Sequence, residues 1–269
     1  MAELVFTILG CGSSGGVPRL GGHWGECDPT NPKNRRRRCA LLVERVTETG
    51  ITRVLIDTSP DLREQLLGAE VGRLDGVIYT HGHADHVHGI DDLRMIVFNQ
   101  RERVRVWADA PTEERLRTGF GYAFEQPEGS PYPPILTLHP IEGDVTVDGA
   151  GGPITLTPFT VRHGSIDALG FRIEDLAYLP DASDLPNEAR ATLSDLKVWI
   201  VDALRRTPHP THTHLEKTLN WIEQVAPDRA ILTNMHIDMD YDTLVGELPE
   251  GIEPAFDGMR VTMPSNTEG

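Results

Sequence analysis

The stretch YTHGHADHVHG, residues 79–89, contains four histidines and one aspartate and directly follows a short apolar run. In an extended loop, residues i and i+2 point the same way, so His81 and His83 can share one metal ion. Asp85 and His86 fall on the next turn, where they can serve a second ion, and these ligand types suit zinc, manganese or iron. An isolated His-x-His is more often a solvated loop or a helix N-terminus. The full H-x-H-x-D-H after a buried strand is much rarer, and it favours a metal site.

Further candidate ligands lie just past the C-terminal ends of other predicted strands. His163 follows TLTPFTVR, Asp181 follows LAYLP, and His236 follows RAILTNM. Each alone reads as a capping histidine, a turn aspartate or a surface histidine. Strand ends on one edge of a sheet converge, so their coincidence with His81 favours one shared site. Asp57, which ends VLIDT, is interpreted either as a carboxylate that orients a metal-bound histidine or as a plain turn residue.

Strand patterns come in runs first and alternate with helical patterns later, which predicts stacked sheets covered by helices in one domain. We predict a single domain over 1–264 and a frayed tail over 265–269. Helices are expected at 61–71, with Ser59 and Pro60 as N-cap and N1 residues, and at 186–195 and 214–226. Residues 120–140 are expected to form an insertion or lid. Strands are expected at 4–10, 40–46, 52–58, 76–80, 103–109, 154–164, 170–173, 176–181, 197–204 and 229–236.

Composition narrows the function classes. The 269 residues are 39% hydrophobic, which suffices for a packed core, and 25 basic against 41 acidic side chains give a net charge of -16. An acidic protein repels nucleic-acid phosphates, so no extended nucleic-acid partner is expected. The three cysteines form no Cys-x-x-Cys pair, which indicates a reducing compartment. With no signal peptide or membrane span in the sequence, a cytoplasmic location is expected.

Together these motifs resemble the metallo-β-lactamase superfamily, nearest the branch of phosphoribosyl 1,2-cyclic phosphate phosphodiesterases. The resemblance covers nearly the whole chain. It implies an α/β fold, a four-layer αβ/βα sandwich, with two divalent ions (zinc or manganese) per chain. The supporting stretches are GCGSSGGVP, RRRRC, LIDTSPDL, YTHGHADHVHGIDDLR, the Gly-Phe after His163, LPDASDLP and FDGMRV.

The resemblance implies roles for single residues. His81, His83 and His163 would hold one metal, Asp85, His86 and His236 the other, and Asp181 would bridge them. His214 would be the proton donor and would contact substrate, with His209 and His212 as nearby alternatives and an N-capping histidine as the plain interpretation. Ser14, Arg38 and Ser183 would bind substrate, while His88 is interpreted as an exposed bystander.

Two departures from the branch pattern stand out. The branch usually shows Leu-Thr-His before the last ligand, whereas this chain reads LTNMH, with Asn234 at the histidine's place and His236 as the nearest substitute. The branch also carries a structural zinc on closely spaced cysteines. Only Cys27 remains in that loop, so no second zinc site is predicted.

The expected function is a dinuclear phosphodiesterase in which a metal-bridging hydroxide attacks a small cyclic phosphodiester, such as a ribose or nucleoside cyclic phosphate. Asp85 would also accept a hydrogen bond from that hydroxide. The partner would be a small phosphate ester or nucleotide, with no membrane and with a homodimer left open. The alternatives are a tRNA 3′-processing endonuclease and a non-catalytic metal- or ligand-binding pathway factor.

Overall fold

The computed structural model describes residues 2–266, in which the chain divides into two compact units. The first comprises Ala40–Thr155 with the described parts of Met1–Leu9 and Arg260–Gly269, and the second comprises Gly10–Cys39 and Leu156–Met259. The expectation of a single domain stays a prediction. Of the expected tail, residues 265 and 266 are described, and Ser265 donates its backbone N–H to the Ala2 carbonyl at 3.0 Å. Residues 267–269 lie outside the described range.

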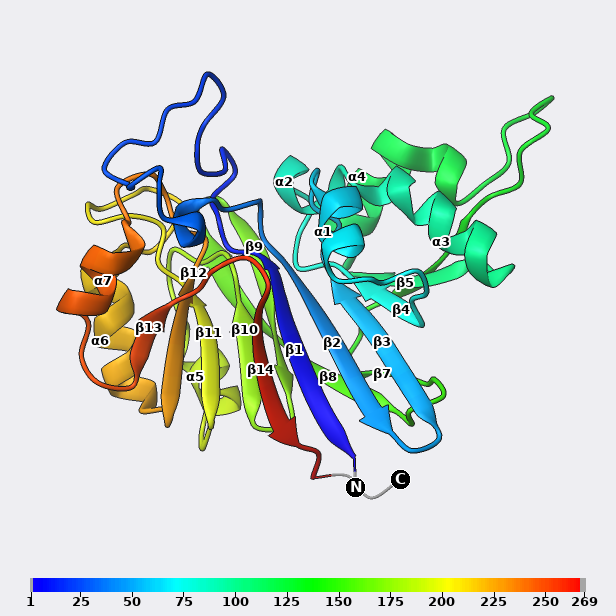
Figure 1. The fold of residues 1–269 in the computed structure, drawn as a ribbon. Helices are drawn as coiled ribbons and strands as arrows, with labels where there is room; N and C mark the ends of the chain where they lie inside the picture. Colours follow the sequence, from blue (N-terminus) through cyan, green and yellow to red (C-terminus); the bar gives the residue numbers. More distant parts are fainter. Residues whose placement is uncertain (1, 267–269) are drawn as a thin grey trace. The chain divides into compact units, whose positions relative to one another are not determined.

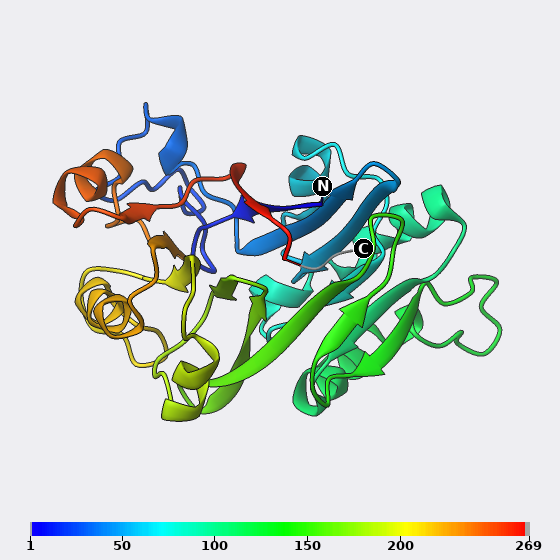
Figure 2. The same cartoon turned by 90° about the horizontal axis from the view of Figure 1, so that it is seen from below.

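The first sheet has seven strands in the order β14-β1-β2-β3-β4-β5-β6. Strands β2 and β3 form an antiparallel hairpin, and β3 to β6 run parallel. Figures 1 and 2 show the last strand, β14, beside the first, β1. The strands are β1 (Glu3–Gly10), β2 (Ala40–Thr47), β3 (Gly50–Ile56), β4 (Gly76–Ile78), β5 (Val104–Ala108), β6 (Leu136–Pro140) and β14 (Met259–Pro264).

Helices of the first unit pack on this sheet through one hydrophobic core. Leu62 and Leu66 of α1, Ile96 of α3 and Leu116 of α4 share that core with Val77 of β4 and neighbouring strand residues. Burial of such apolar surface is the main stabilising contribution to the unit. The helices are α1 (Leu62–Gly68), α2 (Ala84–Val87), α3 (Leu93–Gln100) and α4 (Ala110–Phe120), with short 3-10 turns η2 (Ile90–Asp92) and η3 (Gly121–Ala123).

The second sheet has the order β13-β12-β11-β10-β9-β8-β7. Strands β8, β9 and β10 are antiparallel, while β10 to β13 run parallel. The carboxyl ends of β10, β11 and β12 therefore meet at one edge, where ligands bind in open α/β sheets. The elements are β7 (Val145–Val147), β8 (Ile154–His163), β9 (Ile166–Ile173), β10 (Leu176–Leu179), α5 (Asn187–Thr192), β11 (Val198–Asp202), α6 (Leu215–Val225), β12 (Arg229–Thr233), α7 (Tyr241–Glu247), β13 (Ile252–Pro254) and the 3-10 turn η1 (Pro32–Asn34).

The predicted α/β class with two sheets is confirmed, and each predicted strand and helix is present within a few residues. One helix start was wrong. Helix α1 begins at Leu62 with Asp61 as N-cap, whereas Ser59 was expected there. The Ser59 hydroxyl instead donates to the Gln65 side chain at 2.8 Å and accepts from the Asp61 N–H at 3.1 Å, so it shapes the turn before the helix. None of the helices within residues 2–266 is long and apolar enough to cross a membrane.

Candidate metal centre

In the first unit, hydrogen bonds to the Asp57 carboxylate orient the residues that follow β4. Its side chain is fully buried, and it accepts hydrogen bonds from the Thr80 backbone N–H at 2.8 Å, from the Thr80 hydroxyl at 2.8 Å and from His86 Nδ1 at 2.7 Å. Burial raises the pKa of Asp57, while His86 and Thr80 act in the opposite direction. Asp57 has a left-handed backbone (φ 66°), a conformation that aspartate tolerates better than most residues. It contacts a candidate metal ligand, as its proposed orienting role requires.

His81 and His86 have tautomers that their neighbours fix. The Thr80 hydroxyl gives its only hydrogen to Asp57, so it accepts from His81 Nδ1 at 3.0 Å. His86 likewise donates from Nδ1 to Asp57. In both rings the lone pair is therefore on Nε2, the nitrogen that a metal ion would bind.

The Nε2 atoms of these two rings face other candidate ligand atoms. His81 Nε2 lies 3.1 Å from His83 Nδ1, and His86 Nε2 lies 3.5 Å from an Asp85 carboxylate oxygen. His83 is extended and precedes α2, which carries Asp85 and His86 in its short span. Two ligands of one zinc-like ion, each at about 2.0–2.1 Å in a tetrahedral arrangement, lie about 3.3 Å apart. The donor set and its spacing therefore fit divalent metal ions.

In the second unit, His163 and Asp181 repeat this pattern. His163 ends β8 and donates from Nδ1 to the Thr211 carbonyl at 2.6 Å, which leaves the lone pair on Nε2. That Nε2 lies 3.4 Å from an Asp181 carboxylate oxygen, and both side chains are almost fully buried. Asp181 follows β10 by two residues. The structure thus brings together two of the three predicted ligands that follow strands of the second sheet.

Asp202, His212 and Asn234 extend this cluster along the sheet edge. His212 Nδ1 lies 3.2 Å from an Asp202 carboxylate oxygen and 3.9 Å from Asp181 Oδ2, and its ring centroid is 4.5 Å from that of His163. Asp202 ends β11 and is fully buried. Burial raises the pKa of Asp202 to about 6; His212 opposes the rise and Asp181 adds to it.

Asn234 stands at the end of β12 with its amide turned into the cluster. Its Nδ2 lies 3.2 Å from Asp181 Oδ1, 3.1 Å from Asp202 Oδ1 and 3.1 Å from His212 Nδ1. An amide N–H donor suits two buried carboxylates that would otherwise repel each other. Asp181, Asp202 and Asn234 therefore stand at the carboxyl ends of three neighbouring parallel strands.

The structure separates the three histidines of the loop before α6. His214 is the N-cap residue of α6, and its side chain makes no capping hydrogen bond. His209 accepts from the Thr211 backbone N–H at 3.3 Å, and its ring centroid lies 5.2 Å from that of His212. Only His212 of the three is hydrogen bonded to Asp202 among the described residues. The role predicted for His214 stays a prediction.

His236 lies beside a different set of partners. Its Nδ1 is 3.2 Å from Asp238 Oδ1, and its Nε2 contacts the guanidinium of Arg19. Burial raises the pKa of Asp238, but hydrogen bonds from His236 and from the Arg206 backbone outweigh it and lower that pKa. The assignment of His236 as a metal ligand stays a prediction.

The remaining candidates occupy loops around these residues. Ser183 accepts from the Gly164 N–H at 3.0 Å and donates to the Arg162 carbonyl at 3.1 Å, so it joins the loops that carry His163 and Asp181. Ser14 is exposed in the Gly-rich turn. The Arg38 side chain packs against the same turn: a Cβ added to Gly16 would lie about 4 Å from it. His88 is exposed and packs edge-on against Phe120.

Three residues that lie beside the candidate ligands were not singled out in the sequence: Asp202, His212 and Arg19. Asp202 is an acidic residue at the end of a predicted strand, so the rule that selected Asp181 could have found it. His212 was considered only as an alternative, and no local pattern distinguishes it from His209 or His214. Arg19 carries no sequence signal beyond its place after the Gly-rich turn.

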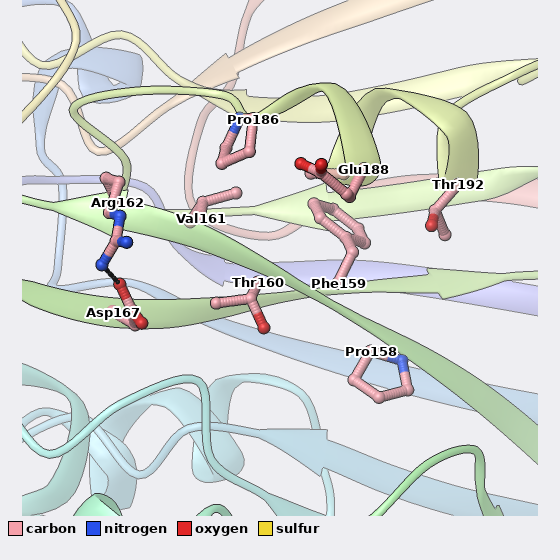
Figure 3. Close-up of a pocket in the computed structure, with 10 residues that line it drawn as sticks. Pro158, Phe159, Thr160, Val161, Arg162, Asp167, Pro186, Glu188 and Thr192 are labelled. Carbon is pink, nitrogen blue, oxygen red and sulfur yellow. Dashed lines mark hydrogen bonds and ion pairs between the residues drawn. The ribbon is translucent and has the colours of Figure 1, made fainter.

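An open pocket of about 430 Å³ lies elsewhere in the second unit, between β8, β9 and α5 (Figure 3). Arg162 and Asp167 form an ion pair at its edge, and Phe159 and Pro186 supply apolar lining. None of the predicted site residues lines it. The histidine and carboxylate clusters, and not this pocket, are therefore the candidate site.

Comparison with known proteins gives a family model and several relatives with different names. The family model described as Beta-lactamase superfamily domain matches residues 52–237. The chain is 33% identical over 257 residues to an octanoyltransferase of Porphyromonas gingivalis (strain ATCC BAA-308 / W83), covering 94% of this chain and 50% of that protein. It is 31% identical over 148 residues to a ribonuclease Z of Bradyrhizobium sp. (strain ORS 278), covering 52% and 45%. The chain thus spans about half the length of the curated relatives it matches.

A solved structure matches over nearly its whole length. A diphosphatase from the PhnP family superposes with a TM-score of 0.83 at 32% sequence identity, covering 96% of this chain and 97% of that one.

Proposed function

The chain belongs to the metallo-β-lactamase superfamily, and we propose that it is a metal-dependent hydrolase of small phosphodiesters. One observation carries the proposal. His81, His86 and His163 each have Nδ1 held by a protein acceptor while Nε2 faces another candidate ligand atom at 3.1–3.5 Å. This is how proteins orient histidines that bind metal ions.

In this proposal the ligands are those that the resemblance assigns. His81 and His83 join His163 at one ion, and these three with Asp181 each offer a ligand atom. Asp85 and His86 would hold a second ion, to which the resemblance also assigns His236 and a carboxylate oxygen of Asp181. Bound zinc or manganese would polarise a phosphoryl oxygen and make water acidic enough to act as a nucleophile near neutral pH.

The leaving alkoxide needs a proton, and the contacts favour His212 over His214 as the donor. Asp202 accepts a hydrogen bond from His212 Nδ1 and so stabilises the imidazolium, whose Nε2 proton would be the one transferred. His214 has no corresponding carboxylate among the described residues. His214 would then act only as the N-cap residue at the start of α6.

The preferred substrate is a small cyclic phosphodiester such as a ribose or nucleoside cyclic phosphate. A second candidate is a diphosphate, because the PhnP-family structure that matches nearly end to end is called a diphosphatase. Both are phosphoryl esters or anhydrides that the same ligand set would hold. The acidic charge of -16 argues against a tRNA-sized substrate.

The test is turnover of 2′,3′-cyclic nucleotides, bis(p-nitrophenyl) phosphate and nucleoside diphosphates by protein loaded separately with zinc and manganese. His83→Ala removes a proposed ligand, and His88→Ala is its matched control because His88 is an exposed histidine of the same loop. We expect His83→Ala to lose activity and bound metal while His88→Ala keeps both. Absence of turnover in every metal form would refute the hydrolase.

A further inference from the structure

Strand β8 has an outer edge, facing away from β9, that offers backbone hydrogen-bonding groups. Arg162 uses its own pair there: its N–H donates to the Asp184 carbonyl at 3.2 Å, and its carbonyl accepts from the Asp184 N–H at 3.2 Å. Residues two apart in a strand direct their backbone groups to the same side. The N–H and C=O of Thr160 and the C=O of Pro158 therefore face this edge as well. Proline has no N–H to offer, which suits an edge position.

The neighbouring strand β7 does not cover these groups. It follows β8 in the order of the sheet and spans only Val145–Val147. The hydroxyl of Thr146, in its middle, lies 2.9 Å from that of Thr155, near the start of β8. A strand so short and so placed does not reach Pro158. The outer edge of β8 between β7 and Asp184 therefore has room for one short added strand.

The pocket of about 430 Å³ lies beside this part of β8. Figure 3 shows the Phe159 ring directed toward α5, next to Glu188, and the Thr160 side chain directed to the opposite side. Phe159 is 4% exposed and Ala189 of α5 is 2% exposed, so the pocket has an apolar wall on the side of α5. A groove between a strand edge and a helix is suited to an extended peptide that adds a strand to the sheet.

Glu188 gives this groove its charge. Its side chain is exposed, lines the pocket and forms no ion pair with another residue of the described range 2–266. Asp167, which also lines the pocket, is neutralised by Arg162. The side chain of lysine or arginine combines an apolar stem with a charged end. Such a residue could cover Phe159 with its stem and reach the Glu188 carboxylate with its charge.

We propose that this edge of β8 binds a short extended segment of a partner protein, as an antiparallel strand with a basic residue facing Glu188. The partner residue opposite Thr160 exchanges a pair of backbone hydrogen bonds with it, and the residue two positions further donates its N–H to the Pro158 carbonyl. The residue between them faces α5, and it is the basic one, over Phe159. The residue before them is small and apolar, beside Val161.

The first experiment measures the binding of a fluorescent peptide, Gly-Val-Thr-Lys-Ser-Gly, to the 269-residue chain by anisotropy. Its threonine is designed to lie opposite Thr160. N-methylation of the peptide's threonine nitrogen removes the N–H that the Thr160 carbonyl accepts, and we expect affinity to fall about fivefold or more. N-methylation of the lysine nitrogen is the matched control, because that N–H points away from β8. Equal losses from the two methyl groups would overturn the proposal.

The second experiment reverses the charges. A peptide with glutamate in place of lysine should bind the wild type about tenfold more weakly, and Glu188→Lys should reverse this preference. Glu223→Lys is the matched control, because Glu223 is an exposed residue of α6 and its replacement changes the net charge equally. It should keep the preference for the lysine peptide. Equal changes of preference in both variants would assign the effect to net charge and overturn the proposal.

Two further measurements test where the peptide binds and whether a second copy of the chain takes its place. In NMR spectra, the amide signal of Thr160 should shift on addition of the lysine peptide, and an unchanged signal would overturn the proposal. Sedimentation should find the same state of association with and without the peptide. A dimer that the peptide dissociates would assign the edge to a second copy, and no peptide binding at millimolar concentration would refute the site altogether.

Discussion

The carboxylate of Asp57 accepts a hydrogen bond from His86 Nδ1 at 2.7 Å, and both side chains are buried. Removing the charge while keeping the shape should weaken the histidine as a metal ligand. We expect Asp57→Asn to lower metal affinity about 10- to 100-fold. Asparagine tolerates the left-handed backbone at this position, so the substitution adds little strain. Competition with a chromogenic chelator measures the loss, and Asp91→Asn, an exposed acid on η2, is the control.

The choice between His212 and His214 is open to a direct kinetic test. His212→Gln should lower kcat about 10²- to 10⁴-fold for esters with poor leaving groups, because these need a proton donor. It should have a much smaller effect on p-nitrophenyl esters, whose leaving group departs unprotonated. His214→Gln should leave both rates near those of the wild type. The reverse ranking of the two variants would restore His214 as the acid.

Asp202 predicts a pH dependence of stability in the metal-free protein. Its pKa is about 6 when folded and near 3.8 when unfolded, so the folded state binds more protons and stability falls as the pH rises through this window. Asp202→Asn lacks this titration. The variant should gain stability relative to wild type between pH 4 and pH 7, by at most about 3 kcal/mol. Urea denaturation at both pH values gives the free energy of unfolding of the variant and of the wild type. If the variant differed from the wild type by the same amount at both pH values, the raised pKa of Asp202 would be contradicted.

Asn234 combines a left-handed backbone with contacts to two carboxylates, and two variants separate these contributions. Asn234→Gly removes the amide but relieves the backbone at φ 60°, while Asn234→Ala removes the amide and keeps the strain. We expect both to destabilise the metal-free protein, alanine more than glycine by about 1 kcal/mol. Chemical denaturation gives both values. Equal stabilities would show that the backbone conformation is not the constraint.

Gly89 tests the packing that supports the histidine loop. A Cβ there would lie 2.0 Å from the Ser59 carbonyl oxygen, so the backbone must shift. We expect Gly89→Ala to lower the free energy of unfolding by about 2 kcal/mol or more. In Gly119→Ala, the matched control within α4, the new Cβ meets nothing within 4 Å. That variant should be neutral or slightly more stable, because alanine favours helix. Thermal unfolding compares the two.

The fold could be predicted from the sequence because hydrophobic periodicity and turn residues indicate the same elements along most of the chain. The candidate ligands of H-x-H-x-D-H could be picked out because they are contiguous and follow one strand. His163 and Asp181 could be picked out as candidates because the carboxyl ends of strands that run in the same direction meet at one edge of a sheet.

The contact between His212 and Asp202 could not be predicted in the same way. His212 lies in an irregular loop with two other histidines, and only the tertiary position of β11 brings Asp202 to one of them. His236 was chosen by its place after a strand, and its assignment as a ligand stays a prediction; in the structure its ring contacts Arg19 and Asp238. Side-chain direction three residues beyond a strand is set by loop packing, which periodicity does not encode.

The position of β14 beside β1 affects how the chain is made. The ribosome releases β1 well before β14, so the edge of β1 that pairs with β14 has no partner strand until residues 259–264 emerge. An unpaired edge is a template for association with other chains. Chaperone binding to nascent chains that stop short of residue 259 would be the cellular sign of this delay.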